Sequence, residues 1–194
     1  VAEIEAGSAV ATPTPGVAHA KTVRAAEVRD ALTSRTTTGS SEIDRVLGGG
    51  LVPGSLVLLA GEPGVGKSTL VLSLAERIGG AVLYVCGEES PEQIALRMRR
   101  LGCTGTQLSF STDTDADAVA SAARAARPAL LIVDSVQSLR ASSSGSEPGG
   151  IGEMRAAIAI LAGVAKKDGI TTVVIGQVTD DGITHAEILL GIDN

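Results

Sequence analysis

The sequence predicts an α/β fold, in which a mainly parallel, twisted sheet carries helices on both of its faces. Five short runs rich in Val, Ile and Leu alternate with amphipathic segments, the pattern of strands joined by crossover helices. These runs are apolar throughout, which is typical of parallel strands buried on both faces. The 194 residues are 44% hydrophobic and predict one main domain with one substantial core.

The predicted elements follow a leader or linker, residues 1–34, whose start is rich in Ala, Thr, Pro and Gly and whose residues 21–32 have the pattern of a short helix. Residues 35–194 are predicted to form the folded domain. Strands are expected at residues 55–60, 81–86, 108–111, 129–134 and 170–176, all central in the sheet, and helices at 41–47, 67–78, 91–101, 115–126 and 151–167.

The last predicted helix has a clear apolar face, which is expected to pack on the sheet. The residues before it, 142–150, are rich in Ser, Gly and Pro, and we expect a mobile loop at the sheet edge where ligands bind. The apolar face consists of Ile151, Met154, Ile158, Leu161 and Ala165.

Charge and composition limit the functions that the chain can serve. The net charge of -6 gives no whole-surface attraction to nucleic acid, so any DNA contact must come from a few loops. Tyr84 and Phe110 are the only aromatic residues, which argues against a base-stacking platform. No apolar stretch has the length of a membrane span and no secretion signal is evident, so we expect a cytoplasmic protein without membrane contact. Cys86 and Cys103 lack metal-ligand spacing and are expected to fill space.

A glycine-rich segment joins the first predicted strand to the following helix. Its spacing is that of a P-loop, whose backbone amides close around phosphates. Lys67 would supply a cation to the outer phosphates, Ser68 a hydroxyl to Mg²⁺, and Thr69 would lie next to the first phosphate. The strand before it and the helix after it argue against an accidental match. The cofactors predicted are ATP and Mg²⁺, and the nucleotide-binding segment is Gly61-Glu62-Pro63-Gly64-Val65-Gly66-Lys67-Ser68-Thr69.

Asp134 ends the apolar run that starts at Ala129, where a second metal ligand must lie opposite the P-loop. A strand-terminal Asp can also simply begin a turn. The P-loop favours the metal-binding interpretation.

Two adjacent carboxylates, Glu88 and Glu89, follow the second predicted strand at the edge where the phosphates are expected. Hydrolysis needs a group that orients or deprotonates water, and Glu88 is the preferred candidate. Like charges repel, so one carboxylate can be held by a partner while the other works, and the sequence does not decide which. Alternatively, the segment only begins a helix, with Ser90 as N-cap and Pro91 at the first position. Both interpretations can hold together.

Gln177 follows the last predicted strand directly and completes, with Lys67 and Glu88, the set of catalytic candidates. Its amide can reach the terminal phosphate and report hydrolysis to the loop behind it. An exposed loop glutamine without such a role is the alternative.

Four blocks extend this pattern beyond the P-loop. They read Gly39-x-x-Glu42-x-Asp44-Arg45-Val46-Leu47-Gly48-Gly49-Gly50, the segment from Gly61 to Thr69, Tyr84-Val85-Cys86-Gly87-Glu88-Glu89-Ser90, and Leu131-Ile132-Val133-Asp134-Ser135-Val136-Gln137. Together, over about residues 35–181, they closely resemble the bacterial RadA (Sms) family. The first two blocks would also suit RecA, archaeal recombinases or the clock ATPase KaiC, and the third favours RadA.

The resemblance implies a RecA-like P-loop NTPase fold and a DNA repair and recombination ATPase. It further implies a hexameric ring that binds single-stranded DNA in its channel and drives branch migration, with RecA recombinase as a further partner. By position, Gly61 to Thr69 would bind nucleotide, Ser68 and Asp134 would hold magnesium, and Glu88 would prepare the water. Loops after Asp134 and Gln177 would face the DNA.

The chain also differs from that family. It starts about where the family's four-cysteine zinc motif would end, so no zinc is expected, and it lacks the Lys-Asn-Arg-Phe-Gly motif and the Lon-protease-like domain. We therefore interpret it as an ATPase core truncated at its C-terminus. Gly176-Gln177-Val178-Thr179-Asp180 stands where the family reads Gly-His-Val-Thr-Lys. Residues 179–194 contain acids but no Lys or Arg, and Arg140 is the only base in the earlier loop, so few phosphate contacts are expected. A KaiC-like regulatory ATPase that acts on protein partners, and a nucleotide-binding module with little turnover, are the alternatives.

Overall fold

The computed structural model describes residues 24, 34–145 and 150–177. The chain divides into two units, residues 1–31 and 32–194, and every element below lies in the second. The short helix predicted at residues 21–32 falls, apart from Arg24, on residues outside the described part. The predicted boundary between leader and domain stays a prediction.

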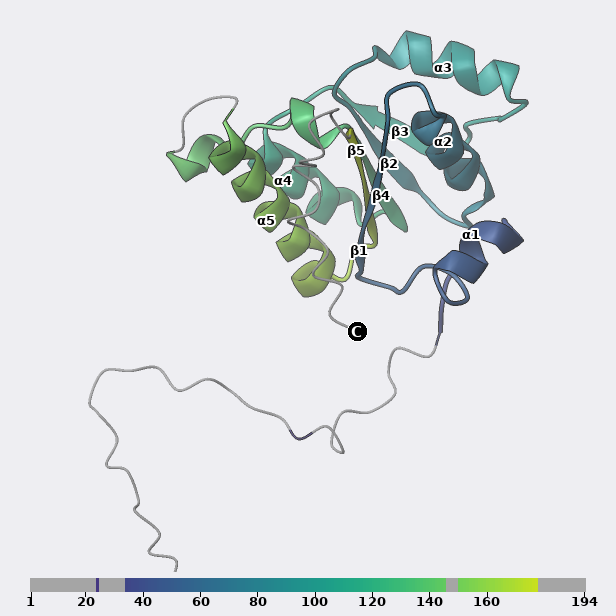
Figure 1. Cartoon of the computed structure of the whole chain (residues 1–194), viewed down its shortest axis with the longest axis horizontal. Helices are drawn as coiled ribbons and strands as arrows, with labels where there is room; N and C mark the ends of the chain where they lie inside the picture. The colour runs from purple at the N-terminus through teal and green to yellow at the C-terminus, as the bar shows by residue number, and fades with distance from the viewer. Residues whose placement is uncertain (1–23, 25–33, 146–149, 178–194) are drawn as a thin grey trace, which may run out of the picture. The chain divides into compact units, whose positions relative to one another are not determined.

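Five parallel strands form one sheet in the order β1-β5-β4-β2-β3 (Figure 1). All five predicted strands are present, with slightly shifted ends. Neighbouring strands that are not consecutive in the sequence and are joined by helices are typical of a doubly wound α/β fold. This agrees with the α/β fold predicted from the sequence. The strands are β1 (Leu56–Gly61), β2 (Val82–Cys86), β3 (Leu108–Ser111), β4 (Leu130–Asp134) and β5 (Thr172–Gln177).

Helices cover both faces of this sheet, which confirms the predicted layering. Figure 1 shows α2 (Lys67–Arg77) and α3 (Pro91–Arg100) on one side, with α4 (Ala116–Ala126) and α5 (Ile151–Asp168) on the other. Alternation along the strands divides the core accordingly. Tyr84, Ile132 and Val173 pack with α2 and α3, whereas Leu83, Leu131 and Val174 pack with α4 and α5. The remaining elements are α1 (Ser41–Val46) and the 3₁₀ turns η2 (Val136–Ser138) and η3 (Ser142–Ser144).

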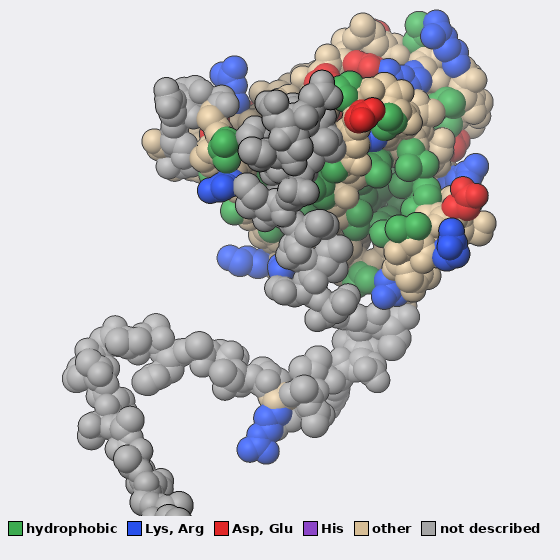
Figure 2. Space-filling model, in the orientation of Figure 1, with side chains coloured by type: hydrophobic (Ala, Val, Ile, Leu, Met, Phe, Trp, Pro, Cys, Tyr) green, Lys and Arg blue, Asp and Glu red, His purple; other side chains and the backbone are tan. Residues whose placement is uncertain are grey.

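The prediction that all five strands are central is wrong for β1 and β3, which are the outer strands of the sheet formed by the described residues. Neither strand contains a fully buried residue, whereas every residue of β2 is buried. Figure 2 shows hydrophobic side chains at the surface between β1 and α1. A short apolar run occurs on partly covered edge strands too, so its composition does not distinguish the two positions.

The apolar face of α5 packs on the sheet as predicted, with one exception. Ile158, Leu161 and Ala165 are buried, but Ile151 is 45% exposed because it is the first residue of the helix, at the end of the packed face. Residues 146–149 of the predicted mobile loop lie outside the described part, and the loop's mobility stays a prediction.

The start of that loop is tied to the N-terminus of α4. Ser142 and Ser143 donate hydrogen bonds from their hydroxyls to Asp115 and Asp117. Asp115 also accepts from the amides of Asp117 and Ala118, and is therefore the N-cap of α4 rather than its first residue. These hydrogen bonds lower the pKa of Asp115, chiefly through the Ser142 hydroxyl.

Candidate functional site

The register of the sheet brings the predicted site residues to one edge. Gly61, at the end of β1, pairs with Gln177 at the end of β5. Asp134, at the end of β4, pairs with Cys86 at the end of β2. Because parallel strands end on the same side, the P-loop, Asp134, Gln177 and the segment after β2 meet where α2 begins, at the top of Figure 1.

The P-loop owes its shape to two glycines in the left-handed region. Gly64 has φ of +81° and Gly66 has φ of +97°, conformations that residues with a Cβ rarely adopt. Gly66 is also the N-cap of α2. Among the described residues, no backbone hydrogen bond uses the amides of Gly64, Val65 or Gly66. Unpaired amides at a helix start form an anion-binding site.

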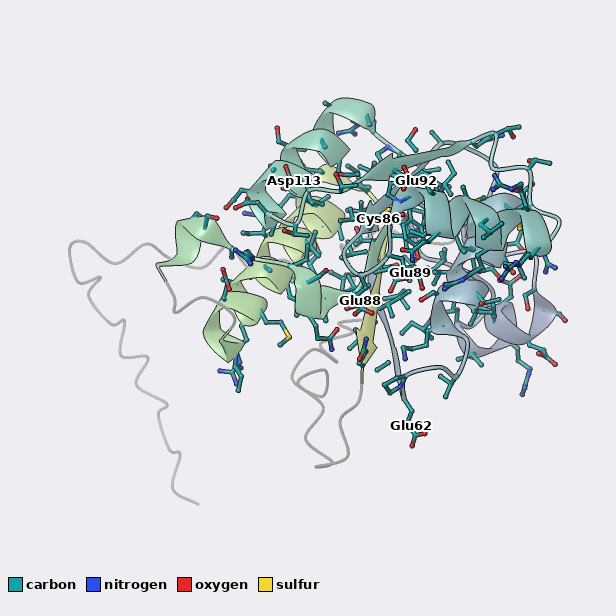
Figure 3. All side chains as sticks on the ribbon, turned by 90° about the horizontal axis from the view of Figure 1, so that it is seen from above. Glu62, Cys86, Glu88, Glu89, Glu92 and Asp113 are labelled. Atoms are coloured by element: carbon teal, nitrogen blue, oxygen red, sulfur yellow. The ribbon has the colours of Figure 1, made fainter. Side chains whose placement is uncertain are left out.

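Lys67 closes the P-loop on itself. Its ammonium donates to the carbonyl oxygens of Gly61 and Glu62, at 2.7 Å each. The Glu62 side chain points away from the sheet (Figure 3), and Val65 is 62% exposed. That Glu62 and Val65 bind nucleotide stays a prediction, and the placement of their side chains favours contacts through the backbone.

A cavity of about 320 Å³ lies at this edge. It brings together P-loop residues, both candidate carboxylates after β2, Asp134 and Gln177, although their positions in the sequence are far apart. Gly61, Glu62 and Val65 do not line it. The lining residues are Pro63, Gly64, Gly66, Lys67, Ser68, Thr69, Glu88, Glu89, Arg97, Asp134, Ile175 and Gln177.

Asp134 and Ser68 are a donor set that fits magnesium, which prefers oxygen ligands and keeps several waters. Both residues line the cavity. Asp134 accepts a hydrogen bond from the Tyr84 hydroxyl through Oδ2, and within the described part of the chain its Oδ1 has no hydrogen-bond partner. Tyr84 is fully buried, and burial raises the pKa of its hydroxyl, so that it stays a donor. Tyr84 thus fixes the carboxylate while one oxygen remains for a metal ion or its water.

The two adjacent carboxylates have different partners. Gln177 donates from its amide to both oxygens of Glu88, at 2.9 and 3.0 Å, and Ser135 donates from its hydroxyl to Glu88 Oε1. Glu89 instead forms an ion pair with Arg97 of α3. Glu88 therefore has the neutral partners and Glu89 the charged one. Ser90 caps α3 in a capping box with Pro91 at its start, so the predicted helix-start role is confirmed alongside.

Three residues that hold the carboxylates of this site were not predicted from the sequence, and neither was Ile175 in the lining of the cavity. Tyr84 and Ser135 fix the carboxylates of Asp134 and Glu88, and Arg97 pairs with Glu89. Ser135 could have been inferred from its place directly after the strand-terminal Asp134. Tyr84 pairs with Ile132 in the register of β2 and β4. Ile132 stands two residues before Asp134, so the side chains of Tyr84 and Asp134 lie on the same face of the sheet. No such signal identifies Arg97 in the sequence, because its contact with Glu89 depends on where α3 begins and in which direction it runs.

Cys86 lies on the same strand as Tyr84, beside Asp134. Burial raises the pKa of the Cys86 thiol to about 11, with the nearby Asp134 carboxylate as the next cause. The thiol is therefore protonated at neutral pH and fills space, as predicted from the sequence.

Gly87 lets the segment after β4 approach the segment after β2. Its amide donates to the Asp134 carbonyl at 2.7 Å, and a Cβ at this position would lie 1.7 Å from Ser138 Oγ. We expect Gly87→Ala to displace η2 and to lower the free energy of unfolding by about 1–3 kcal/mol, as overpacking does. Thermal and urea denaturation measure this loss.

The matched control is Gly163→Ala in α5, where an added Cβ meets no atom within 4 Å. There alanine is expected to raise stability by up to about 1 kcal/mol, because it favours a helix more than glycine does. Equal melting temperatures for the two variants would show that the close approach at Gly87 does not matter.

Comparison with known proteins identifies the family of the domain that contains the cavity. Residues 22–182 match the family described as AAA domain, and this stretch contains every residue that lines the cavity. The chain belongs to the AAA-domain family. This AAA domain contains the RecA-like arrangement of P-loop, parallel sheet and flanking helices that the sequence predicted, and it is an AAA-type ATPase domain.

Three relatives of the AAA domain are bacterial proteins named DNA repair protein RadA. The one from Pseudomonas aeruginosa is 43% identical over 152 residues, covering 76% of this chain and 33% of the relative. The one from Mycobacterium tuberculosis is 47% identical over 151 residues, covering 75% and 31%. The one from Bacillus subtilis is 42% identical over 151 residues, covering 76% and 33%. The resemblance to the RadA family is confirmed, and the chain spans about a third of the length of these relatives.

None of the described helices of the AAA domain is long and apolar enough to cross a membrane. A cytoplasmic location stays a prediction from the sequence.

Proposed function

We propose that this chain is the ATP-hydrolysing core of a DNA repair and recombination ATPase whose hydrolysis is stimulated by single-stranded DNA. One observation carries the proposal: a single cavity is lined by Lys67, Ser68, Glu88 and Asp134. Phosphoryl transfer to water needs these groups together, namely a cation for phosphates, oxygens for Mg²⁺ and a carboxylate for the water. The relatives' printed name, DNA repair protein RadA, supports the biological setting.

In this proposal, P-loop amides and the Lys67 ammonium bind the outer phosphates in place of the two loop carbonyls that Lys67 now contacts. Ser68 and Asp134 would hold magnesium, which when bound offsets the charge that develops on the phosphates. Glu88 orients the attacking water and accepts its proton.

Gln177 is the proposed sensor, because its side-chain amide donates to Glu88 and the residue also lines the cavity. A terminal phosphate that accepts from this amide would replace one or both contacts with Glu88. The Gln137 amide donates to the Gln177 backbone carbonyl at 3.2 Å, which links β5 to the turn after β4. Displacement of Gln177 would therefore reach η2, where DNA contacts are implied by the RadA resemblance.

The motor part of the proposal is a homo-oligomeric ring, hexameric in the intact family member, that moves on DNA and can act with RecA recombinase. The ATPase rate with and without single-stranded DNA, measured across salt concentrations, tests it. Stimulation that fades as salt rises is expected, because each phosphate contact releases counterions on binding. Hydrolysis without any DNA effect at low salt would contradict the motor proposal for this chain. Size in solution with and without nucleotide tests the ring.

A regulatory ATPase of the KaiC type is the second candidate, favoured by the charge of the loops. Between residues 178 and 194 the sequence has Asp180, Asp181, Glu187 and Asp193 but no Lys or Arg. Such a segment repels DNA phosphates and suits a protein partner better. DNA-independent hydrolysis is the result that favours this candidate.

A further inference from the structure

An ion pair lies in the cavity beside the proposed catalytic groups. Arg97 donates from its guanidinium to Glu89 Oε1, and both side chains line the same cavity as the P-loop. The pair is about one third exposed, at 32% and 36% for the two side chains. Glu88 does not share in it, because its oxygens are bound by Ser135 and Gln177.

The start of α3 explains why these two residues meet. A capping box between Ser90 and Gln93, with Pro91 at the first helical position, fixes the direction in which the helix leaves Glu89. Side chains on a helix lean toward its N-terminus, so Arg97, fewer than two turns inside, can reach back to Glu89. The ion pair therefore forms within the short segment from Glu89 to Arg97, and the capping box at Ser90 fixes the bend of the chain between its two residues.

The charge of the cavity suggests what the pair does. A nucleoside triphosphate is a polyanion, and three carboxylates, Glu88, Glu89 and Asp134, line the space that would receive it. Asp134 has the magnesium role and Glu88 the water role in the proposed function, which leaves Glu89 as a carboxylate that would only repel phosphates. Arg97 offsets that charge and turns Glu89 toward α3.

We propose that Arg97 is a positioning residue that neutralises Glu89 and holds it away from the phosphates, so that the cavity accepts a nucleoside triphosphate. This inference rests on the proposed function. It places Arg97 outside direct contact with the ligand and predicts that nucleotide affinity follows the net charge of positions 89 and 97.

Four proteins test this inference: the wild type, Arg97→Gln, Glu89→Gln and the double variant. Arg97→Gln leaves one uncompensated negative charge, and we expect the dissociation constant for a fluorescent ATP analogue with Mg²⁺ to rise about three- to tenfold. Glu89→Gln frees a cation and should lower that constant by a similar factor. The double variant restores the original charge and should bind as the wild type does. The differences should shrink as ionic strength rises.

Single-turnover hydrolysis of bound ATP gives a second readout. Because Glu88 keeps its partners in all four proteins, the rate at saturating nucleotide should stay within about twofold while the affinity changes. A double variant as weak as Arg97→Gln would overturn the proposal, since it would mean that Arg97 contacts the nucleotide or supports the fold. Glu89→Gln with unchanged or weaker binding would overturn it as well.

Folding is controlled by two further variants. Arg97→Lys keeps the charge and should bind nucleotide within about twofold of the wild type, and Arg100→Gln removes an exposed base of α3 that does not line the cavity. Should Arg97→Gln fail to fold, Glu89→Gln must still tighten binding. A wild type without saturable binding would instead contradict the proposed function. If the wild type binds, Lys67→Ala does not, and the Arg97 and Glu89 variants are indistinguishable, only this inference fails.

Discussion

Replacing Lys67 by alanine is expected to weaken nucleotide binding by on the order of 100-fold or more. Charge-assisted hydrogen bonds contribute about 1.5–3 kcal/mol each, and two lost phosphate contacts therefore correspond to at least about two orders of magnitude in affinity. Within the part of the chain that the structure describes, the hydrogen bonds of the Lys67 ammonium go to the loop carbonyls of Gly61 and Glu62, and Lys67 lines the cavity. Titration with a fluorescent ATP analogue and Mg²⁺ measures the change.

The control for this variant is Lys167→Ala, which removes an exposed lysine near the end of α5, outside the cavity. It should bind nucleotide as the wild type does. Equal affinities for Lys67→Ala and Lys167→Ala would mean that the P-loop does not hold the triphosphate, and the proposed function would fail with it.

The second large effect is expected at Glu88. Glutamine there keeps an oxygen that can accept from Ser135, so the fold and nucleotide binding should persist, but it cannot accept a proton from water. We expect hydrolysis of bound ATP to fall by about 100- to 10,000-fold, which is the usual contribution of a general base. Phosphate release at saturating ATP measures this rate.

Glu89→Gln is the matched comparison, because it makes the same chemical change one residue away. It should keep hydrolysis near the wild-type rate, since Glu89 is paired with Arg97 and has no contact with Gln177 among the hydrogen bonds of the described residues. If the hydrolysis rate falls sharply in Glu89→Gln but stays normal in Glu88→Gln, then Glu89 rather than Glu88 is the general base. A wild-type rate that already equals background, and does not change in Glu88→Gln, would leave only a nucleotide-binding module.

The order of elements could be predicted from the sequence because apolar runs and helix caps are local signals. The strand ending in Asp134 and the P-loop helix beginning at Lys67 were placed correctly for this reason. Edge positions were not, since the coverage of β1 and β3 depends on which strands neighbour them, and that is decided by the whole sheet. Ile151 was misplaced on the buried face for a similar reason: periodicity gives a face but not how far the packing extends along it.

The candidate site was predictable where a residue type and a strand end coincide. Asp134 and Gln177 end strands, Glu88 follows one closely, and Lys67 was given instead by the spacing of the P-loop. The structure brings all four to one cavity, while their catalytic roles remain proposals. Which of two adjacent carboxylates is held by a partner could not be read from the sequence. That distinction depends on Arg97, whose side chain reaches Glu89 only because of the way α3 begins.

The pairing of β1 with β5 has a consequence for assembly of the cavity. The strand that leads into the P-loop and the strand that ends in Gln177 are the first and last described strands along the chain, yet they are neighbours in the sheet. Closing a contact between segments so far apart in the sequence costs more loop entropy than closing a local one, so we expect the cavity to form late in folding. A ligand bound in the cavity at the ends of these two strands would consequently stabilise the entire domain, by RT ln(1 + [L]/Kd), rather than one loop of it.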